Sequence, residues 1–450
     1  MKKIPIQSGG ADKAADNMKK KILEAVDSIS VLGNKYYVSP TGCDKNDGLS
    51  PERPIKSYKQ IAELDLKEND SVLFERNGVF RTDGMIWLKN GVSYGAYGSG
   101  KKPLILGSVR NYADFSIWSE TENGIWKTTL KNAVPSIITF DNDSYIGCQK
   151  YSIDDICEDG DFFFNNEESV LYLKFGGGNP GNAFSDIEIG TADNAGRSHF
   201  NHDIVVENLC FKYFCVGAFN FAESRDITVS NCVFGWSGGR IFDIDAVRKI
   251  PSRYGNAIEF WHLAENVTVK SCYIYQQFDA ALTFQGFGEE TPCFKNIRFE
   301  ENLIEYCSMN IEFWTRNGDD GDIAHISDIL YKGNIVRFGG YGWAGKQRFN
   351  KENQALLLGW NYHYDDLSSF VIQDNIFDCA DSYMIYTLSP SNQEGLKVTK
   401  NSYYQKVPSG IHKFTEIIKG TDYKATDEQR LKEAILTFDE NPKIVKWIDS

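Results

Sequence analysis

The chain has 450 residues, a formal net charge of −14 and an aromatic content of 14%. This negative charge argues against nucleic acid or an anionic membrane as a partner, because both repel an acidic surface. The length exceeds that of a usual compact domain, whereas a solenoid has no such limit because its core grows along one axis.

The N-terminal segment, residues 1–34, predicts a capping helix. Apolar residues Met18, Ile22 and Val26 recur on one face of residues 11–29, as in an amphipathic helix that plugs an open solenoid end. The first residues are basic, and no apolar run of about 18 residues occurs in the chain. We therefore expect a cytoplasmic protein with no membrane contact, and a secreted protein that has lost its export signal is the alternative.

Residues 35–107 predict the first solenoid coils. The segment YYVSPTGCDKNDGLSPERPIKSY (36–58) is followed by two strand-rich segments, SVLFERNGVFR (71–81) and GVSYGAYGSGKKPLILG (91–107). Together these segments resemble the opening of right-handed parallel β-helix proteins of the pectate-lyase-like superfamily. The resemblance extends to about residue 405 and implies an all-β, right-handed parallel β-helix with a carbohydrate-active tendency. It does not imply one reaction, because the fold hosts hydrolases, lyases, esterases and epimerases.

Residues 108–190 interrupt the coil pattern. Short apolar strands such as DFFF (161–164) and VLYL (170–173) alternate with Asn, Gly and Asp turns. We expect a small inserted antiparallel β subdomain, similar to one found in several β-helical glycoside hydrolases. The segment IEIG (187–190) is predicted to return the chain to the β-helix.

Residues 191–405 predict the main β-helix, because one short pattern returns seven times. Its second and fourth positions are apolar, and a unit this short with period-two alternation must stack on its own copies. The seventh position is Asn302, Asn334, Asn375 and Asn401 in the last four frames, which predicts a ladder of stacked side chains. The frames begin at Asp203, Asp226, Asn266, Asn296, Asp328, Ser369 and Gly395.

Residues 406–450 predict a C-terminal helical cap. Thr426 to Gln429 fit a capping box, and Leu431, Ala434 and Ile435 form an apolar stripe. We expect this helix to cover the second end of the solenoid or to lie along its side.

A second set of strands lies between the repeats and carries the candidate site. These strands read AIEFW (257–261), ALTFQ (281–285) and NIEFW (310–314). Alternation turns the Ile, Leu and Phe side chains inward, so that Glu259, Thr283 and Glu312 form one outward column. A second outward column holds Trp261, Gln285 and Trp314.

Three acids in this region are the catalytic candidates: Glu259, Asp279 and Glu312. Glu259 and Glu312 lie two rungs apart, about 9.6 Å, whereas Asp279 precedes the middle strand and lies about one rung from each. Inverting glycosidases hold their carboxyls about 6.5–9.5 Å apart, and retaining ones about 5–5.5 Å. Both distances are therefore available, and the sequence leaves open which acid is the proton donor and which is the base or nucleophile.

The candidate substrate-binding residues flank these acids. Exposed aromatic side chains stack on sugar rings, and arginines bind hydroxyls or uronates. Two of the candidates, Trp343 and Arg348, lie on the Gly-rich loop 339–353, which we expect to border the cleft. The candidates are Trp261, Gln285, Trp314, Arg316, Trp343 and Arg348.

The sequence predicts no cofactor and no metal site. The ten cysteines form no CxxC pair and predict buried thiols in a reducing compartment, and the histidines are expected to be ordinary polar residues. The acidic turn NGDDGD (317–322) keeps Ca²⁺ as a minor alternative, although it lacks the terminal Glu of a calcium loop.

Three functions follow from these patterns. A glycoside hydrolase that acts on an oligo- or polysaccharide is favoured, because three acids accompany two outward tryptophans. A polysaccharide lyase or epimerase acting on uronates is the second interpretation, supported by Lys346 and Arg348. A non-catalytic glycan-binding module is the third. The sugar, the linkage, the anomeric outcome and the oligomeric state do not follow from the sequence.

Overall fold

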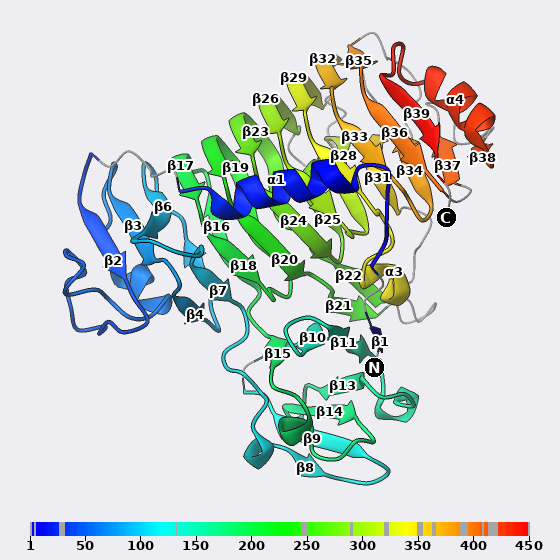
Figure 1. Ribbon diagram of the computed structural model, residues 1–450. Coiled ribbons are helices and arrows are strands. Elements are labelled where there is room, and N and C mark those ends of the chain that lie inside the picture. Colours follow the sequence, from blue (N-terminus) through cyan, green and yellow to red (C-terminus); the bar gives the residue numbers. More distant parts are fainter. Residues whose placement is uncertain are drawn as a thin grey trace.

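The protein is an all-β parallel β-helix, which confirms the predicted fold (Figure 1). The computed structural model describes residues 2–3, 6–26, 32–131, 133–244, 251–288, 291–318, 324–348, 354–361, 366–387, 395–406, 409–412 and 422–448. Each coil stacks on the next through parallel strand pairs, so that backbone groups bond along the axis.

The described coils have three faces. The first, a 10-stranded sheet, consists of β4 (Val79–Arg81), β7 (Leu104–Leu106), β18 (Cys210–Lys212), β20 (Val233–Ser237), β24 (Tyr273–Gln277), β27 (Leu303–Glu305), β30 (Ile335–Arg337), β33 (Ile376–Asp378), β36 (Ser402–Gln405) and β39 (Ile444–Trp447).

The other two faces form one 18-stranded sheet, because the long strands β19 (Gly217–Ser230) and β23 (Ile258–Lys270) run through both. The repeat face comprises β2 (Lys35–Val38), β3 (Ser71–Glu75), β6 (Ser93–Tyr97), β17 (His202–Glu207), β26 (Cys293–Glu300), β29 (His325–Lys332), β32 (Asp366–Gln373) and β35 (Leu396–Thr399), with the later halves of β19 and β23. The seven frames lie on β17, β19, β23, β26, β29, β32 and β35. The site face comprises β5 (Ile86–Trp87), β16 (Asn194–His199), β25 (Ala280–Gly288), β28 (Met309–Gly318), β31 (Ala355–Asn361), β34 (Tyr383–Thr387), β37 (Ser409–His412) and β38 (Asp422–Ala425), with the earlier halves of β19 and β23.

The repeat sequence determines the corner of each coil. The residue at the sixth position has a positive φ in all seven frames, from 50° at Ser271 to 68° at Gly333. The residue that follows this left-handed corner is the predicted ladder position. Asn302 donates from Nδ2 to Asn334 Oδ1 at 3.0 Å, Asn334 donates to Asn375 at 2.9 Å, and Asn375 donates to Asn401 at 3.0 Å. The predicted ladder is therefore confirmed, and it ends on Asp439, which accepts from Asn401 at 2.9 Å.

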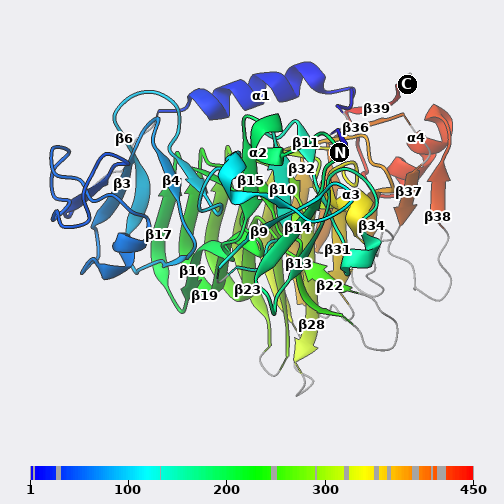
Figure 2. The same ribbon diagram turned by 90° about the horizontal axis from the view of Figure 1, so that it is seen from below.

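The N-terminal helix does not plug an end, contrary to the prediction. Helix α1 (Asp12–Glu24) lies along the side of the coils (Figures 1 and 2) and packs Ala15 and Ile22 against apolar residues of the 10-stranded face. Its start is held there because buried Arg337 pairs with Asp12. Near the first coils, the segment around the 3₁₀ helix η1 (Lys59–Glu63) packs Tyr58 and Ile61 into the main core.

The inserted antiparallel subdomain is present beside the coils, next to β22 (Pro251–Tyr254) and the short helix α3 (Ala344–Gln347) (Figures 1 and 2). Gln347 joins the two parts, since its Nε2 donates to Gly147 O at 2.9 Å. The elements of the subdomain are β8 (Ser119–Glu120), β9 (Ile125–Thr129), β10 (Ile137–Phe140), β11 (Tyr145–Ile146), β12 (Cys148–Gln149), β13 (Asp161–Asn165), β14 (Val170–Lys174), β15 (Ile187–Gly190), η2 (Phe115–Ile117), η3 (Ile153–Asp155) and α2 (Pro180–Ala183).

Two features of the subdomain differ from the prediction. The IEIG segment is β15, which pairs antiparallel with β10 and so belongs to the subdomain, whereas the return to the coils is made by β16. In addition, the N-terminal strand β1 (Lys2–Lys3) joins the subdomain through β11.

The C-terminal helix α4 (Glu428–Leu436) packs Leu431, Ala434 and Ile435 into the main core at the end of the solenoid. Its N-terminus is capped by Asp427, whose side chain accepts from Arg430 N at 2.9 Å. The predicted apolar stripe is therefore buried, and the cap residue is Asp427 rather than Thr426. Within the described residues, no helix is long and apolar enough to cross a bilayer.

Candidate active site

The predicted outward columns exist on the site face. Glu259 of β23 is in register with Thr283 of β25, which is in register with Glu312 of β28. Trp261, Gln285 and Trp314 are paired in the same way. The registers are maintained by the inward residues of the same strands, since Phe284 and Phe313 stack with centroids 5.9 Å apart in the core.

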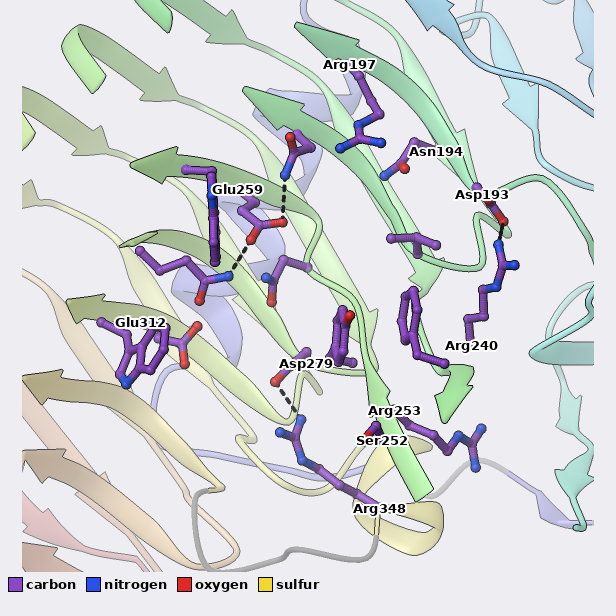
Figure 3. Close-up of a pocket in the computed structure, with 18 of the residues that line it drawn as sticks. Asp193, Asn194, Arg197, Arg240, Ser252, Arg253, Glu259, Asp279, Glu312 and Arg348 are labelled. Atoms are coloured by element: carbon purple, nitrogen blue, oxygen red, sulfur yellow. Dashed lines mark hydrogen bonds and ion pairs between the residues drawn. The ribbon is translucent and has the colours of Figure 1, made fainter. Parts of the chain in front are cut away.

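These columns form the floor of a pocket of about 810 Å³. A hairpin of β21 (Arg240–Ile244) and β22 forms one wall, and Arg348, which follows α3, lies at another edge (Figure 3). The pocket is lined by Asp193, Asn194, Arg197, Val216, Asn220, Arg240, Phe242, Pro251, Ser252, Arg253, Tyr254, Asn256, Glu259, Trp261, Asp279, Gln285, Phe287, Glu312, Trp314 and Arg348.

Glu312 has a strongly perturbed acid group. Its side chain is buried, and its Oε2 accepts a hydrogen bond of 2.9 Å from Thr283 Oγ1. Burial, reinforced by the nearby Asp279 carboxylate, raises the pKa of Glu312 to about 8. Glu312 is therefore protonated at neutral pH and can donate a proton.

Asp279 reaches the pocket from the turn before β25. Its backbone is held by the two adjacent coils, because its N–H donates to Gly255 O at 3.2 Å and its carbonyl accepts from Met309 N at 3.2 Å. Its carboxylate accepts a charge-assisted hydrogen bond of 2.5 Å from Arg348 Nη1. Asp279 thus presents a carboxylate, held by a cation, beside the protonated Glu312 (Figure 3).

Glu259 is held by two amides from neighbouring rungs. Asn220 Nδ2 donates to its Oε2 at 3.0 Å, and Gln285 Nε2 donates to its Oε1. Burial raises the pKa of Glu259 above its ordinary value, and these hydrogen bonds oppose that effect. The side chain therefore has a fixed orientation toward the pocket.

Aromatic rings form two sides of the pocket. Phe287 lies between Trp261 and Trp314 and meets both edge-on, with centroids 5.2 and 4.9 Å apart. On the hairpin, Phe242 and Tyr254 stack with centroids 4.1 Å apart. Such flat apolar faces beside acids are suited to sugar rings.

The structure brings most of the predicted residues together. Asp279, Glu259 and Glu312 line one pocket with Trp261, Gln285, Trp314 and Arg348. The side chain of Arg316 lies outside the described residues, as do most residues of the acidic turn 317–322. Among the residues that the structure describes, no three His, Cys, Asp or Glu side chains are grouped to hold a metal ion.

Trp343 requires a correction, because it does not line the pocket. Its indole is 3% exposed and packs on Phe278, with centroids 5.0 Å apart. Its Nε1 donates to the carbonyl of Gln276 at 2.9 Å. The Gly-rich loop therefore uses Trp343 as an internal anchor, and this anchor places Arg348 at the pocket.

Several pocket residues were not anticipated, notably Arg197, Asn220 and Phe287. Asn220 and Arg197 continue the outward column, since Arg197 pairs with Asn220 and Asn220 pairs with Glu259. The segment AFNF (218–221) has the same alternation as AIEF and NIEF, so a wider alignment of the strands would have identified Asn220.

Comparisons with known proteins support the fold. No family model matches the chain, and no curated protein matches it. Among solved structures, the chain is similar to XylC in complex with xylose, with a TM-score of 0.53 and 11% identity over 84% of this chain and 71% of that one.

Two further similar structures have lower TM-scores. One is a glycoside hydrolase, with a TM-score of 0.46 and 10% identity over 92% of this chain and 96% of that one. The other is a GH136 lacto-N-biosidase from Eubacterium ramulus, with a TM-score of 0.40 and 15% identity over 92% of this chain and 67% of that one. At these identities the similarity shows the fold alone.

Proposed function

We propose that the protein is a glycoside hydrolase. The observation that carries the proposal is the pairing of a protonated buried acid, Glu312, with an arginine-bound carboxylate, Asp279, in a pocket lined by tryptophans. Cleavage of a glycosidic bond needs one carboxyl that donates a proton and one carboxylate that attacks or activates water.

In the proposed mechanism, Glu312 is the general acid. It transfers its proton to the glycosidic oxygen as the bond between that oxygen and the anomeric carbon breaks. Asp279 attacks the anomeric carbon and forms a glycosyl ester. Water then cleaves this ester while Glu312 accepts a proton from that water, which regenerates both groups. This chemistry draws on side chains alone and requires no cofactor.

The choice of Asp279 as nucleophile rests on its position. Among the charged neighbours of Glu312, Asp279 raises the pKa of that acid more than Glu259 does. Asp279 precedes the strand next to that of Glu312, and adjacent rungs are about 4.8 Å apart, close to the spacing of retaining enzymes. If Glu259 instead activated water, the two-rung separation of about 9.6 Å would favour inversion.

The experiment is a screen of aryl glycosides and defined oligosaccharides with the wild type, Glu312→Gln and Asp279→Asn. We expect one glycoside class to be cleaved, Asp279→Asn to abolish that cleavage, and Glu312→Gln to abolish it for the oligosaccharides, whose leaving groups need a proton. Proton NMR should show a product of retained anomeric configuration. Glu265→Gln is the matched control, because Glu265 lies on β23 but pairs with surface Lys295. Treatment with EDTA tests the calcium alternative, and it should leave the activity unchanged.

Three results would contradict the proposal. Cleavage of uronate polymers to an unsaturated product would identify a lyase. Glycan binding with no cleavage of any substrate would identify a binding module. Oligosaccharide cleavage that survives each of the two substitutions would place the chemistry elsewhere.

A further inference from the structure

Arg197 occupies a distinctive position in the pocket. It belongs to the outward column of the site face, two rungs from Glu259 through Asn220 and four rungs from Glu312. Its side chain is exposed and points into the pocket beside Asn194 (Figure 3).

The other arginines of the pocket already have partners. Arg348 pairs with Asp279, and Arg240 pairs with Asp193. Arg253 is buried and donates to Gly239 O at 2.8 Å and to Gln149 Oε1 at 2.9 Å. Within the described part of the chain, Arg197 forms no ion pair, and its guanidinium lies 6.0 Å from the ring centroid of Trp87.

The charges of the pocket therefore leave a positive excess. Two arginine–aspartate pairs cancel, and Glu312 is protonated at neutral pH. This leaves two cations, Arg197 and Arg253, and one acid, Glu259, whose carboxyl accepts hydrogen bonds from two amides. The net charge of the chain is −14, so this local excess of positive charge does not result from a generally basic surface.

We propose that Arg197 forms a subsite for an anionic substituent of the glycan, a carboxylate or a sulfate. This inference rests on the proposed hydrolase function and specifies its substrate class. Four rungs span about 19 Å, so the anionic group lies on a sugar beyond the one that is cleaved. Trp87, on the next rung and 52% exposed, extends the same surface and offers a stacking face to that sugar.

The test measures binding separately from catalysis. The Glu312→Gln protein is screened against an array of matched glycans that are neutral, carry a uronate carboxylate or carry a sulfate ester. The best anionic glycan and its neutral counterpart are then compared by titration calorimetry in proteins that also carry Arg197→Ala, Arg197→Lys or Arg225→Ala. Arg225 is the matched control, because it is an exposed arginine of β19 that pairs with Asp226 outside the pocket.

We expect the anionic glycan to bind about tenfold more tightly than its neutral counterpart at low salt. Arg197→Ala should remove this preference, Arg197→Lys should retain part of it, and Arg225→Ala should leave it unchanged. The preference of a carboxylate over a sulfate, or the reverse, identifies the group.

Two outcomes would overturn the inference: no preference for anionic glycans, or a preference that persists in Arg197→Ala. Hydrolysis of neutral glycans by the wild type together with either outcome would leave the proposed function standing. Conversely, anion-dependent binding without any hydrolysis would support the subsite and reject the catalytic proposal.

Discussion

Asp279 and Arg348 form an ion pair of 2.5 Å although they lie 69 positions apart in the sequence. Arg348 comes from the Gly-rich loop and also donates to the carbonyl of Phe278 at 3.3 Å, so it holds both the side chain of Asp279 and the turn that carries it. The arrangement of the acids therefore depends on a loop that is anchored by Trp343.

Replacement of Arg348 tests this relationship. We expect Arg348→Ala to lower kcat/KM by roughly 10–100-fold, because one charge-assisted hydrogen bond is worth about 1.5–3 kcal/mol. Arg348 lowers the pKa of Glu312, so the alkaline limb of the pH profile should also move to higher pH. Arg348→Lys, which keeps the charge, should move that limb less. An unchanged pH profile in Arg348→Ala would argue for a purely structural role.

Glu312→Gln tests the role of a proton donor. Loss of a general acid costs about 10²–10⁴-fold in rate when the leaving group needs protonation. Aryl glycosides whose phenol is strongly acidic leave without that proton, so they should retain much more activity than alkyl glycosides. Rates for a series of leaving groups check this expectation. Equal losses across the series would show that Glu312 acts in another way.

The pH dependence of stability follows from the same residue. The folded pKa of Glu312, about 8, is above its ordinary value of 4.5, so the folded state binds the extra proton between these values. The stabilisation is complete below about pH 4.5 and is lost as the pH rises through 8. The unfolding free energy of the wild type should therefore fall with pH relative to Glu312→Gln, by up to about 1.4 kcal/mol per pH unit. Urea denaturation from pH 5 to 9 measures the difference, and parallel curves would contradict it.

Replacement of Trp314 and replacement of Trp343 should have different effects on KM and on stability. Trp314→Ala removes an aromatic ring that lines the pocket, so we expect KM to rise roughly 3–10-fold. The unfolding free energy should change less than in Trp343→Phe. Trp343→Phe removes the donor to the buried carbonyl of Gln276 and should cost about 1–3 kcal/mol of unfolding free energy. Its KM should change less than that of Trp314→Ala. Kinetics and thermal melts of both variants decide the assignment, and the reverse pattern would refute it.

The asparagine ladder predicts a large stability effect far from the pocket. Asn334 donates to Phe299 O at 2.7 Å and to Asn375 Oδ1 at 2.9 Å, and its Oδ1 accepts from Asn302. Asn334→Ala leaves these buried groups without partners, and we expect a loss of roughly 3 kcal/mol in urea denaturation. Asn296→Gly, at a half-buried asparagine whose φ of 53° glycine tolerates, is the control and should cost less.

The β-helix and the acid columns were predictable because both repeat. Each coil packs on its neighbours alone, so the alternation of apolar residues reports which side chains point inward and which point outward. This local rule is sufficient to align Glu259, Thr283 and Glu312, and the same reasoning predicted the ladder from Asn302 to Asn401. The sequence by itself therefore determined the fold and the floor of the pocket.

Only the tertiary structure decided what surrounds that floor. Trp343, Arg348 and helix α1 lie outside the seven repeat frames, so no period indicates where they pack. Trp343 and Arg348 lie five residues apart on one loop, yet the first is buried against Phe278 and the second faces Asp279. Likewise, α1 lies along the side, where Ile22 packs on the 10-stranded face and Arg337 pairs with Asp12, a contact between residues 325 positions apart. Contacts of this kind depend on the assembled coils, so they cannot be predicted from the local sequence.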